Sequence, residues 1–292
     1  MKKQFLYIVI ISVLIQTIFI TNSFSASFIW IGTNSSSWLV SGNWSGGGGG
    51  ATPGSGDNIT LNSNAPNNLV LDQNRTVANF TINGDTVDLG TYTLTTTGVT
   101  YFNGGKIVNG RLQPGGGLCH FGGTVFDVKI AASCTYFHMN GGVFLKPVDL
   151  VSSGTSNTTG TGNCTFEDSL TITHSGVFYF TMGSSTNDFF NGPVTITNHA
   201  SKEVYLANGD TSFYNANVTI SSTGNGGVAF GNGGGVSVLA SGKTISIGSG
   251  LCSGLFNTKK LYPKRNHITN IDFNRNGNRE YDFMYLQWFI GN

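Results

Sequence analysis

The chain repeats one eight-residue motif four times: FEDSLTIT at residues 166–173, FNGPVTIT at 190–197, YNANVTIS at 214–221 and LASGKTIS at 239–246. The threonine before the isoleucine recurs after 24, 24 and 25 residues. A fixed period of this length is typical of a stacked repeat architecture. Apolar and polar residues alternate within the motif, as in a strand with one buried face. The motif therefore predicts coils of a β-solenoid in which Ile172, Ile196, Ile220 and Ile245 lie one above another.

Weaker versions of the motif extend the predicted solenoid toward the N-terminus. The segments 124–130 and 143–150 alternate in the same way, and alignment of Lys129, Asp149 and Thr171 gives steps of 20 and 22 residues. Glycines separate these segments, and glycine supplies the positive φ that sharp corners require. One coil buries too few side chains to offset the entropy of its backbone, so we expect the coils to be stable only when stacked.

The composition indicates an ordered protein with few charges. The 292 residues include 42 Gly and are 39% hydrophobic and 12% aromatic, but only 10% are charged. The apolar content is sufficient for a core. A formal net charge of +1 provides no basic surface of the kind that binds nucleic acid, so we expect no nucleic-acid partner.

The N-terminal 26 residues have the order of a secretory signal peptide. Lys2 and Lys3 precede an apolar run over residues 5–20, and small or polar residues follow as far as Ala26. We therefore predict an exported chain, secreted or held at the cell surface, with no membrane span after cleavage. An uncleaved anchor is the alternative, although the run is shorter than the ~20 residues that a span needs.

Four cysteines remain in the predicted mature chain: Cys119, Cys134, Cys164 and Cys252. An even number of cysteines in an exported chain permits disulfides, but three pairings are possible and the spacing does not choose between them. Cys119 and Cys134 are candidates to meet on neighbouring coils. Each cysteine is equally compatible with a small buried residue in the stack.

Three of the four tryptophans lie close together near the start of the predicted mature chain, at Trp30, Trp38 and Trp44. The first coil of a solenoid has an open end that must be covered, and clustered indole rings suit a cap over residues 27–61. Exposed aromatic rings also stack on sugars, so the same three residues are candidates for a glycan-binding platform. After this cap, residues 62–250 form the predicted solenoid.

The order of residues in this segment resembles a known group of proteins. Trp30-Ile31-Gly32, Trp38, Asn43-Trp44, a glycine run, Pro53 and the segment 57–61 resemble the opening of secreted repeat proteins of gram-negative bacteria. These are autotransporter passengers and filamentous adhesins. The resemblance covers residues 28–105, and the repeats extend it to about residue 250. It implies a right-handed parallel β-helix at the cell surface and carries no catalytic motif.

The C-terminal tail, residues 251–292, departs from the repeat. It holds six of the 15 Lys and Arg residues but three of the 42 Gly residues. We weigh a terminal cap against a stretch that does not belong to the repeat protein at all, such as the product of a disrupted reading frame. In the second case the chain is a truncated fragment without an independent function.

The hydroxyl side chains of the motif form the most regular predicted surface. If each motif is a strand, the threonines flanking the isoleucine stack as two outward rows. These candidate binding residues are Thr171, Thr173, Thr195, Thr197 and Thr219. Such rows resemble the ice-facing surface of antifreeze β-solenoids. Threonine is also common at exposed strand positions of ordinary proteins.

An enzyme is the main alternative, because parallel β-helices often host polysaccharide lyases and hydrolases. Hydrolysis of a glycoside needs two carboxylates at a set distance across the sugar. The candidate acids are scattered through the solenoid: Asp127, Asp149, Glu167, Asp168, Asp188, Glu203 and Asp210. Because these acids are scattered, we assign no catalytic residue. The spacing of His and Cys matches no zinc motif, and we assign no metal or cofactor. We predict instead an adhesin-like protein that presents a polar solenoid face to extracellular glycans or cell-surface components.

Overall fold

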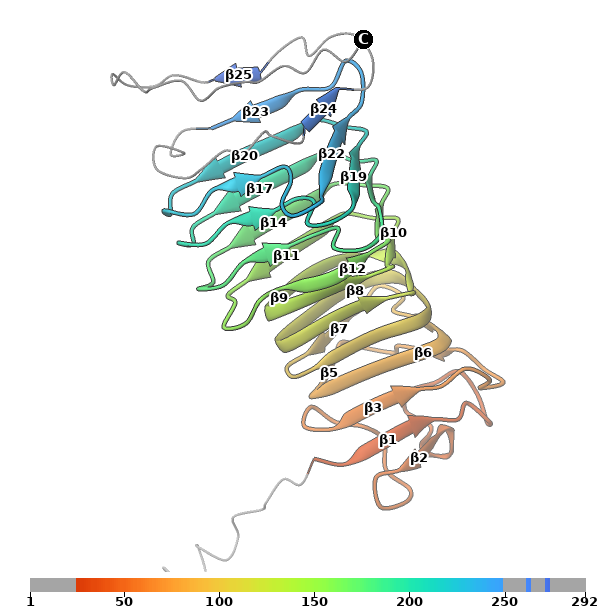
Figure 1. Cartoon of the computed structure of the whole chain (residues 1–292). Helices are drawn as coiled ribbons and strands as arrows, with labels where there is room; N and C mark the ends of the chain where they lie inside the picture. Colours follow the sequence, from red (N-terminus) through yellow and green to blue (C-terminus); the bar gives the residue numbers. More distant parts are fainter. Residues whose placement is uncertain (1–24, 249–260, 264–270, 274–292) are drawn as a thin grey trace, which may run out of the picture.

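The strands of this chain stack in parallel, coil upon coil, along one axis (Figure 1). The structure is a computed structural model that describes residues 25–248, 261–263 and 271–273. Over these residues the strands form one 22-stranded sheet and one three-stranded sheet, arranged in about nine coils. The prediction of an all-β parallel β-solenoid is confirmed. The described residues include no helix with the length and hydrophobicity needed to cross a bilayer.

The N-terminal coils begin with β1 and β2, which form an antiparallel pair, and continue in parallel pairs from β1 to β3 and onward. The elements of this half are β1 (Ser27–Trp30), the 3-10 helix η1 (Ser41–Asn43), β2 (Trp44–Gly46), β3 (Asn58–Leu61), β4 (Leu69–Val70), β5 (Arg75–Val77), β6 (Asn79–Asp88) and β7 (Thr93–Thr96). Two long bent strands, β8 (Thr100–Gly122) and β9 (Val125–Asn140), follow and pair with each other along most of their length.

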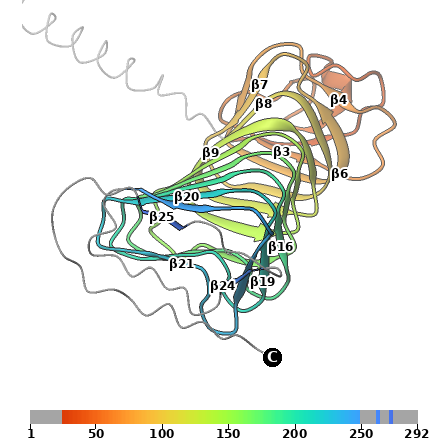
Figure 2. The ribbon, with the colours of Figure 1, turned by 90° about the horizontal axis from the view of Figure 1, so that it is seen from above.

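The later coils share a plan with strands on three sides, visible along the axis in Figure 2. The first side contains β10 (Val143–Phe144), β13 (Thr165–Phe166), β16 (Asp188–Phe190), β19 (Thr211–Tyr214) and β22 (Val236–Leu239). The second contains β11 (Val148–Ser152), β14 (Leu170–His174), β17 (Val194–Asn198), β20 (Val218–Ser222) and β23 (Ile245–Ile247). The third contains β12 (Thr159–Gly162), β15 (Phe180–Thr181), β18 (Val204–Tyr205) and β21 (Val228–Ala229).

Aromatic residues on five successive coils, including those that open the first three motifs, form a continuous ladder inside the solenoid. Phe126, Phe144, Phe166, Phe190 and Tyr214 lie in register on successive coils. Their ring centroids are 4.5–5.2 Å apart and their planes are within 8° of parallel. Stacked rings of this kind add to the stabilisation that comes from burial alone. The ladder therefore sets the register of the later coils.

The predicted isoleucine stack is correct for three of its four members. Ile172, Ile196 and Ile220 lie in register, but Ile220 pairs with Ile247, and Ile245 pairs with Val218 instead. The predicted partner was wrong by two residues, because the corner before β23 is longer than the equivalent corners. Strand alternation has a period of two, so a shift of two residues keeps the same face inward.

The predicted alignment of Lys129 with Asp149 is also wrong by two residues. Asp149 pairs with Ala131 on one side and with Thr171 on the other. Phe126 beneath Phe144 fixes this register, and the step between these coils is shorter than the motif comparison suggested. The shift is again two residues, so the inward residues were still identified correctly.

Several predictions concern residues outside or at the edge of the described part of the chain. All but the last two residues of the predicted signal peptide, 1–26, lie outside the described residues. Cys252 also lies outside them. The tail 251–292 is described only at β24 (Leu261–Pro263) and β25 (Ile271–Phe273), which pair in parallel with β22 and β23.

Cys119, Cys134 and Cys164 are buried free thiols. Burial raises the pKa of Cys119 well above its usual range and that of Cys164 to about 12.

Candidate functional site

The three clustered tryptophans lie inside the first coil. Trp30, Trp38 and Trp44 are 2%, 0% and 6% exposed, and the ring of Trp44 packs edge-on against the other two at 4.9 and 5.0 Å. Their indole N–H groups donate to the carbonyl oxygens of Asn67, Pro53 and Trp38, respectively. A buried ring has no free face for a sugar, so these three residues belong to the core of the first coil and do not form the glycan-binding platform considered above.

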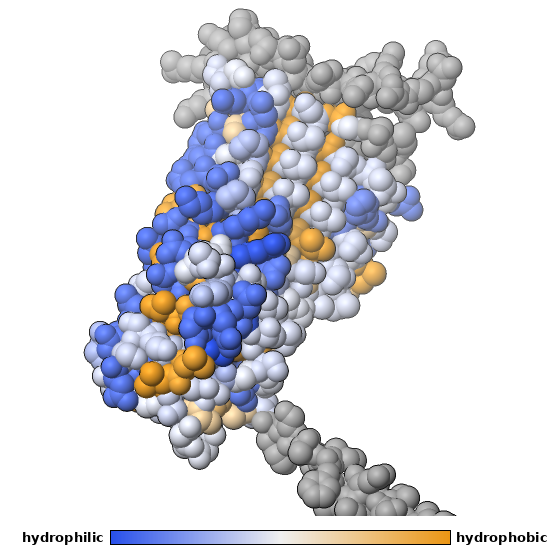
Figure 3. All heavy atoms as spheres, turned by 180° about the vertical axis from the view of Figure 1, so that it is seen from behind, coloured by the Kyte–Doolittle hydropathy of each residue, from blue (hydrophilic) through white to orange (hydrophobic). Residues whose placement is uncertain are grey.

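The five threonines lie in two rows on the second side of the solenoid. Thr171, Thr195 and Thr219 are in register, as are Thr173 and Thr197. Thr195 and Thr219 are exposed and the other three are half-buried. Figure 3 shows this side in its upper part as pale columns with narrow apolar stripes between them. The rows are regular over β14, β17 and β20.

The rows do not continue through the whole solenoid. Toward the N-terminus, Asp149 and Ala131 take the place of the first row, and Val151 and Ser133 that of the second. Val151 is exposed. The threonine rows therefore span three coils, and Ser246 of β23 continues the first row on the next coil.

The candidate acids are distributed over different surfaces. Asp127 lies between Lys106 and Lys146, at 3.6 and 3.7 Å, and Glu167 accepts a hydrogen bond from Asn191. Asp149 is on the side of the hydroxyl rows, whereas Asp188 is fully buried. No group of three or more His, Cys, Asp or Glu side chains in the described part of the chain is placed to hold a metal ion.

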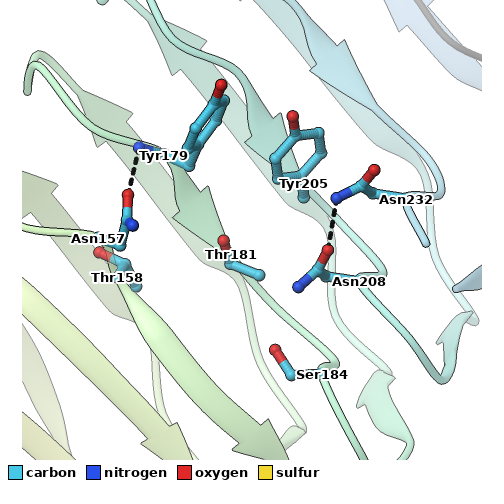
Figure 4. A pocket seen from close by; sticks show the side chains of 8 residues that line it. All are labelled: Asn157, Thr158, Tyr179, Thr181, Ser184, Tyr205, Asn208 and Asn232. Atoms are coloured by element: carbon cyan, nitrogen blue, oxygen red, sulfur yellow. Dashed lines mark hydrogen bonds between the residues drawn. The ribbon is translucent and has the colours of Figure 1, made fainter.

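A shallow depression of about 350 Å³ opens on the third side of the solenoid (Figure 4). Its walls come from β15 and β18, from the residues just before β12 and β15, and from the turns that follow β15, β18 and β21. The described residues that line it are Asn157, Thr158, Tyr179, Thr181, Ser184, Tyr205, Asn208 and Asn232. They are amides, hydroxyls and two phenols, with no carboxylate and no cation among them.

Two tyrosines from successive coils stand side by side at the edge of this depression. The rings of Tyr179 and Tyr205 are stacked with centroids 5.2 Å apart, and the Lys202 ammonium lies 5.3 Å from the ring centre of Tyr179. Burial, together with the nearby Glu203 carboxylate and the Tyr179 phenol, raises the pKa of Tyr205 to about 12. Tyr205 is therefore a neutral hydrogen-bond donor and acceptor at physiological pH.

The amides of the depression are held by the coil stacking. Asn232 donates to the Oδ1 atom of Asn208 at 2.6 Å, one coil away, and Asn157 accepts from the backbone N–H of Tyr179 at 3.4 Å. Ala229 pairs with Tyr205 on the next coil, so no large side chain stands in register beyond that ring. Rigid aromatic rings beside amides that retain free donors and acceptors suit the recognition of polyhydroxyl ligands.

The corners before β15, β18 and β21 are each braced by an inward side chain. His174, Asn198 and Ser222 lie in register at the ends of β14, β17 and β20. Their side chains bond to the carbonyl oxygens of Phe178, Lys202 and Gly226 at 2.7, 2.9 and 2.9 Å. Each carbonyl belongs to the residue four positions later. These bonds orient the segments that carry Tyr179 and Tyr205.

Sequence reasoning did not find this site. Tyr179 and Tyr205 lie outside the repeated motif and at different distances from it, eight residues after Thr171 and ten after Thr195. The available signal was an aromatic residue downstream of two consecutive motifs. Comparison of the chain with protein-family models, with curated proteins and with solved structures gives no match. The described fold and this depression define the chain as a parallel β-solenoid with a polar-aromatic surface site.

Proposed function

We propose that this protein is an exported, adhesin-like β-solenoid that binds neutral extracellular glycans through the tyrosine depression. The proposal combines the predicted signal peptide, the resemblance to surface repeat proteins and the site on the third side of the solenoid. The observation that carries it is the pair Tyr179 and Tyr205 beside Asn157, Asn208 and Asn232. The action is binding and attachment, without chemical change of the ligand.

The residues at the site support a neutral ligand. Aromatic faces favour the apolar C–H face of a pyranose, while amides and hydroxyls pair with its hydroxyl groups. The described residues lining the depression carry no charge at neutral pH, so ionic attraction of an acidic glycan is not the expected basis of binding. Hydrolysis of a glycoside needs two carboxylates, which this depression does not supply.

A rigid solenoid also suits attachment to a surface. Its coils are joined by continuous strand pairing, so the site is held at a fixed position relative to the hydroxyl rows. Several weak contacts on one rigid body, or several copies at one surface, raise the effective affinity without any strong single contact.

The test is a glycan array probed with the mature chain, residues 27–292, followed by titration of the best neutral oligosaccharide. We expect binding that changes little with salt, because no ion pair is involved. The double substitution Tyr179→Ala with Tyr205→Ala should weaken binding by about tenfold or more, which corresponds to ~1.4 kcal/mol.

The matched control is Tyr101→Ala, since Tyr101 is an exposed tyrosine on β8, outside the depression. This variant should bind as the unmodified chain does. Absence of binding to any glycan on the array would refute the proposed function. Equal loss of affinity in the control would show that the depression is not the site.

A further inference from the structure

His174 is a buried titratable side chain with a structural bond to the corner that precedes the tyrosine depression. The residue is 1% exposed, and its Nε2 atom lies 2.7 Å from the carbonyl oxygen of Phe178. A carbonyl can only accept, so Nε2 carries the proton and donates it. Phe178 immediately precedes Tyr179, and this bond therefore fixes the direction in which the tyrosine-bearing segment leaves the corner.

The next two coils make the same bond with groups that do not titrate. Asn198 donates to the carbonyl oxygen of Lys202, and Ser222 donates to that of Gly226. At the equivalent corners of the next two coils, an amide and a hydroxyl are therefore sufficient to make this bond. Among the three, only the imidazole of His174 can gain a proton near physiological pH.

The surroundings of His174 are poorly suited to a positive charge. Ser152 of β11 lies in register below it and Asn198 of β17 above it, and the Phe180 ring of β15 is 6.1 Å away. None of these three residues is charged. The Nδ1 atom has no hydrogen-bond partner within the described structure, and burial lowers the pKa of the imidazole by more than the backbone groups of Phe178 and Ser152 raise it.

We propose that His174 is a positioning residue for the tyrosine depression, and that its protonation in acid loosens the corner 175–178 and displaces Tyr179. A proton from solvent adds to Nδ1, and the Nε2 proton stays in place. The resulting cation must either remain in an uncharged interior or move outward with the corner, and the second outcome breaks the bond to Phe178. Release of a bound neutral glycan in acid would follow, and this consequence rests on the proposed function.

The first test does not depend on any ligand. Hydrogen exchange of residues 175–181 is measured by mass spectrometry at about pH 7.5 and about pH 5, on either side of the ordinary histidine pKa of about 6.5, with correction for intrinsic exchange rates. In the unmodified chain we expect faster corrected exchange at the lower pH. His174→Asn should abolish this difference, since Asn198 shows that asparagine can make the bond. His174→Ala should exchange rapidly at both pH values.

Two controls separate this corner from general effects of acid. Residues 199–204, braced by Asn198, should show no pH difference in the unmodified chain. His199 is an exposed histidine on the coil next to His174. His199→Asn should leave the pH difference at residues 175–181 intact. The same exchange pattern in the unmodified chain and in His174→Asn would overturn the proposal.

The second test measures the affinity for the best neutral oligosaccharide of the array at the same two pH values. We expect at least a fivefold loss of affinity in acid for the unmodified chain and none for His174→Asn. If the exchange difference is present but the affinity is independent of pH, the positioning role is overturned. If the chain binds no glycan at all, the proposed function fails, and the exchange result still decides whether His174 controls the corner.

Discussion

At the scale of single residues, Asp188 is the clearest departure from an apolar interior. Its side chain is fully buried on β16. Oδ1 accepts a hydrogen bond from the backbone N–H of Cys164 at 2.8 Å, whereas Oδ2 has no partner among the described atoms. Burial disfavours the carboxylate and raises the pKa of Asp188 from 3.8 to about 7. The folded protein therefore holds a proton on Asp188 under conditions in which the unfolded chain has lost it.

This difference predicts that Asp188 makes the fold less stable as pH rises. Below about pH 4 both states are protonated, so the favourable contribution is complete. It is lost as pH rises toward the folded-state pKa of about 7, by at most about 4 kcal/mol in total. Asp188→Asn should remove this loss and be more stable than the unmodified chain at pH 8. Urea unfolding of both proteins from pH 4 to 8 is the measurement, and parallel curves would contradict the prediction.

At the scale of elements, the aromatic ladder of β10, β13, β16 and β19 does more to fix the register than the threonine rows do. The ladder lies inside and contacts neighbours above and below, while the rows are on the surface. Phe166 has stacked rings on both sides, Phe144 at 4.5 Å and Phe190 at 5.2 Å. Removal of one ring leaves a cavity in the middle of the stack.

Phe166→Ala should therefore lower the free energy of unfolding by about 3–5 kcal/mol. Phe166→Leu, which retains most of the buried volume, should cost less. Thr195→Ala is the surface comparison and should change stability by about 0.5 kcal/mol or less. Urea titration followed by circular dichroism measures all three. A loss for Thr195→Ala equal to that for Phe166→Ala would show that the surface rows determine stability.

At the scale of the whole molecule, the solenoid is a stack in which each coil mainly contacts its two neighbours. Two successive coils, 166–189 and 190–213, follow the same plan, since Phe166, Phe190 and Tyr214 lie in register. In such an architecture, stability is close to a sum over coils and their interfaces. Coil number is then a variable that the fold tolerates, provided that the register is kept.

A second copy of residues 191–214, inserted after Tyr214, should fold as one additional coil. The stack should lengthen by about 4.8 Å, measured by small-angle X-ray scattering, with unchanged β-sheet content. Insertion of residues 191–202 alone adds half a coil and places later strands on the wrong sides of the solenoid. That chain should lose cooperative unfolding. Equal behaviour of the two insertions would be incompatible with the register-based stack.

How much of the molecule was predictable depends on which features are periodic. Alternation with a period of two identified the inward residues, and the 24-residue recurrence identified the coils, because both are properties of local sequence. Alternation cannot detect a shift of two residues, so Ile245 and Lys129 were placed on the correct face but beside the wrong neighbours. For Ile245, the shift comes from two additional residues in the corner before β23, where Gly242 has a φ of 74°.

The candidate site required the three-dimensional arrangement. Tyr179 meets Tyr205 across two successive coils, whereas His174 reaches Phe178 within one coil, across the corner between β14 and β15. Thr181, and not Tyr179, is the register partner of Tyr205, so the contact between the two rings has no signature in the 24-residue period. The amino-acid pattern thus specified a strand-rich stack with an apolar interior. Which outward side chains share one depression was decided by the stacking itself, since contacts between coils depend on every residue inserted between them.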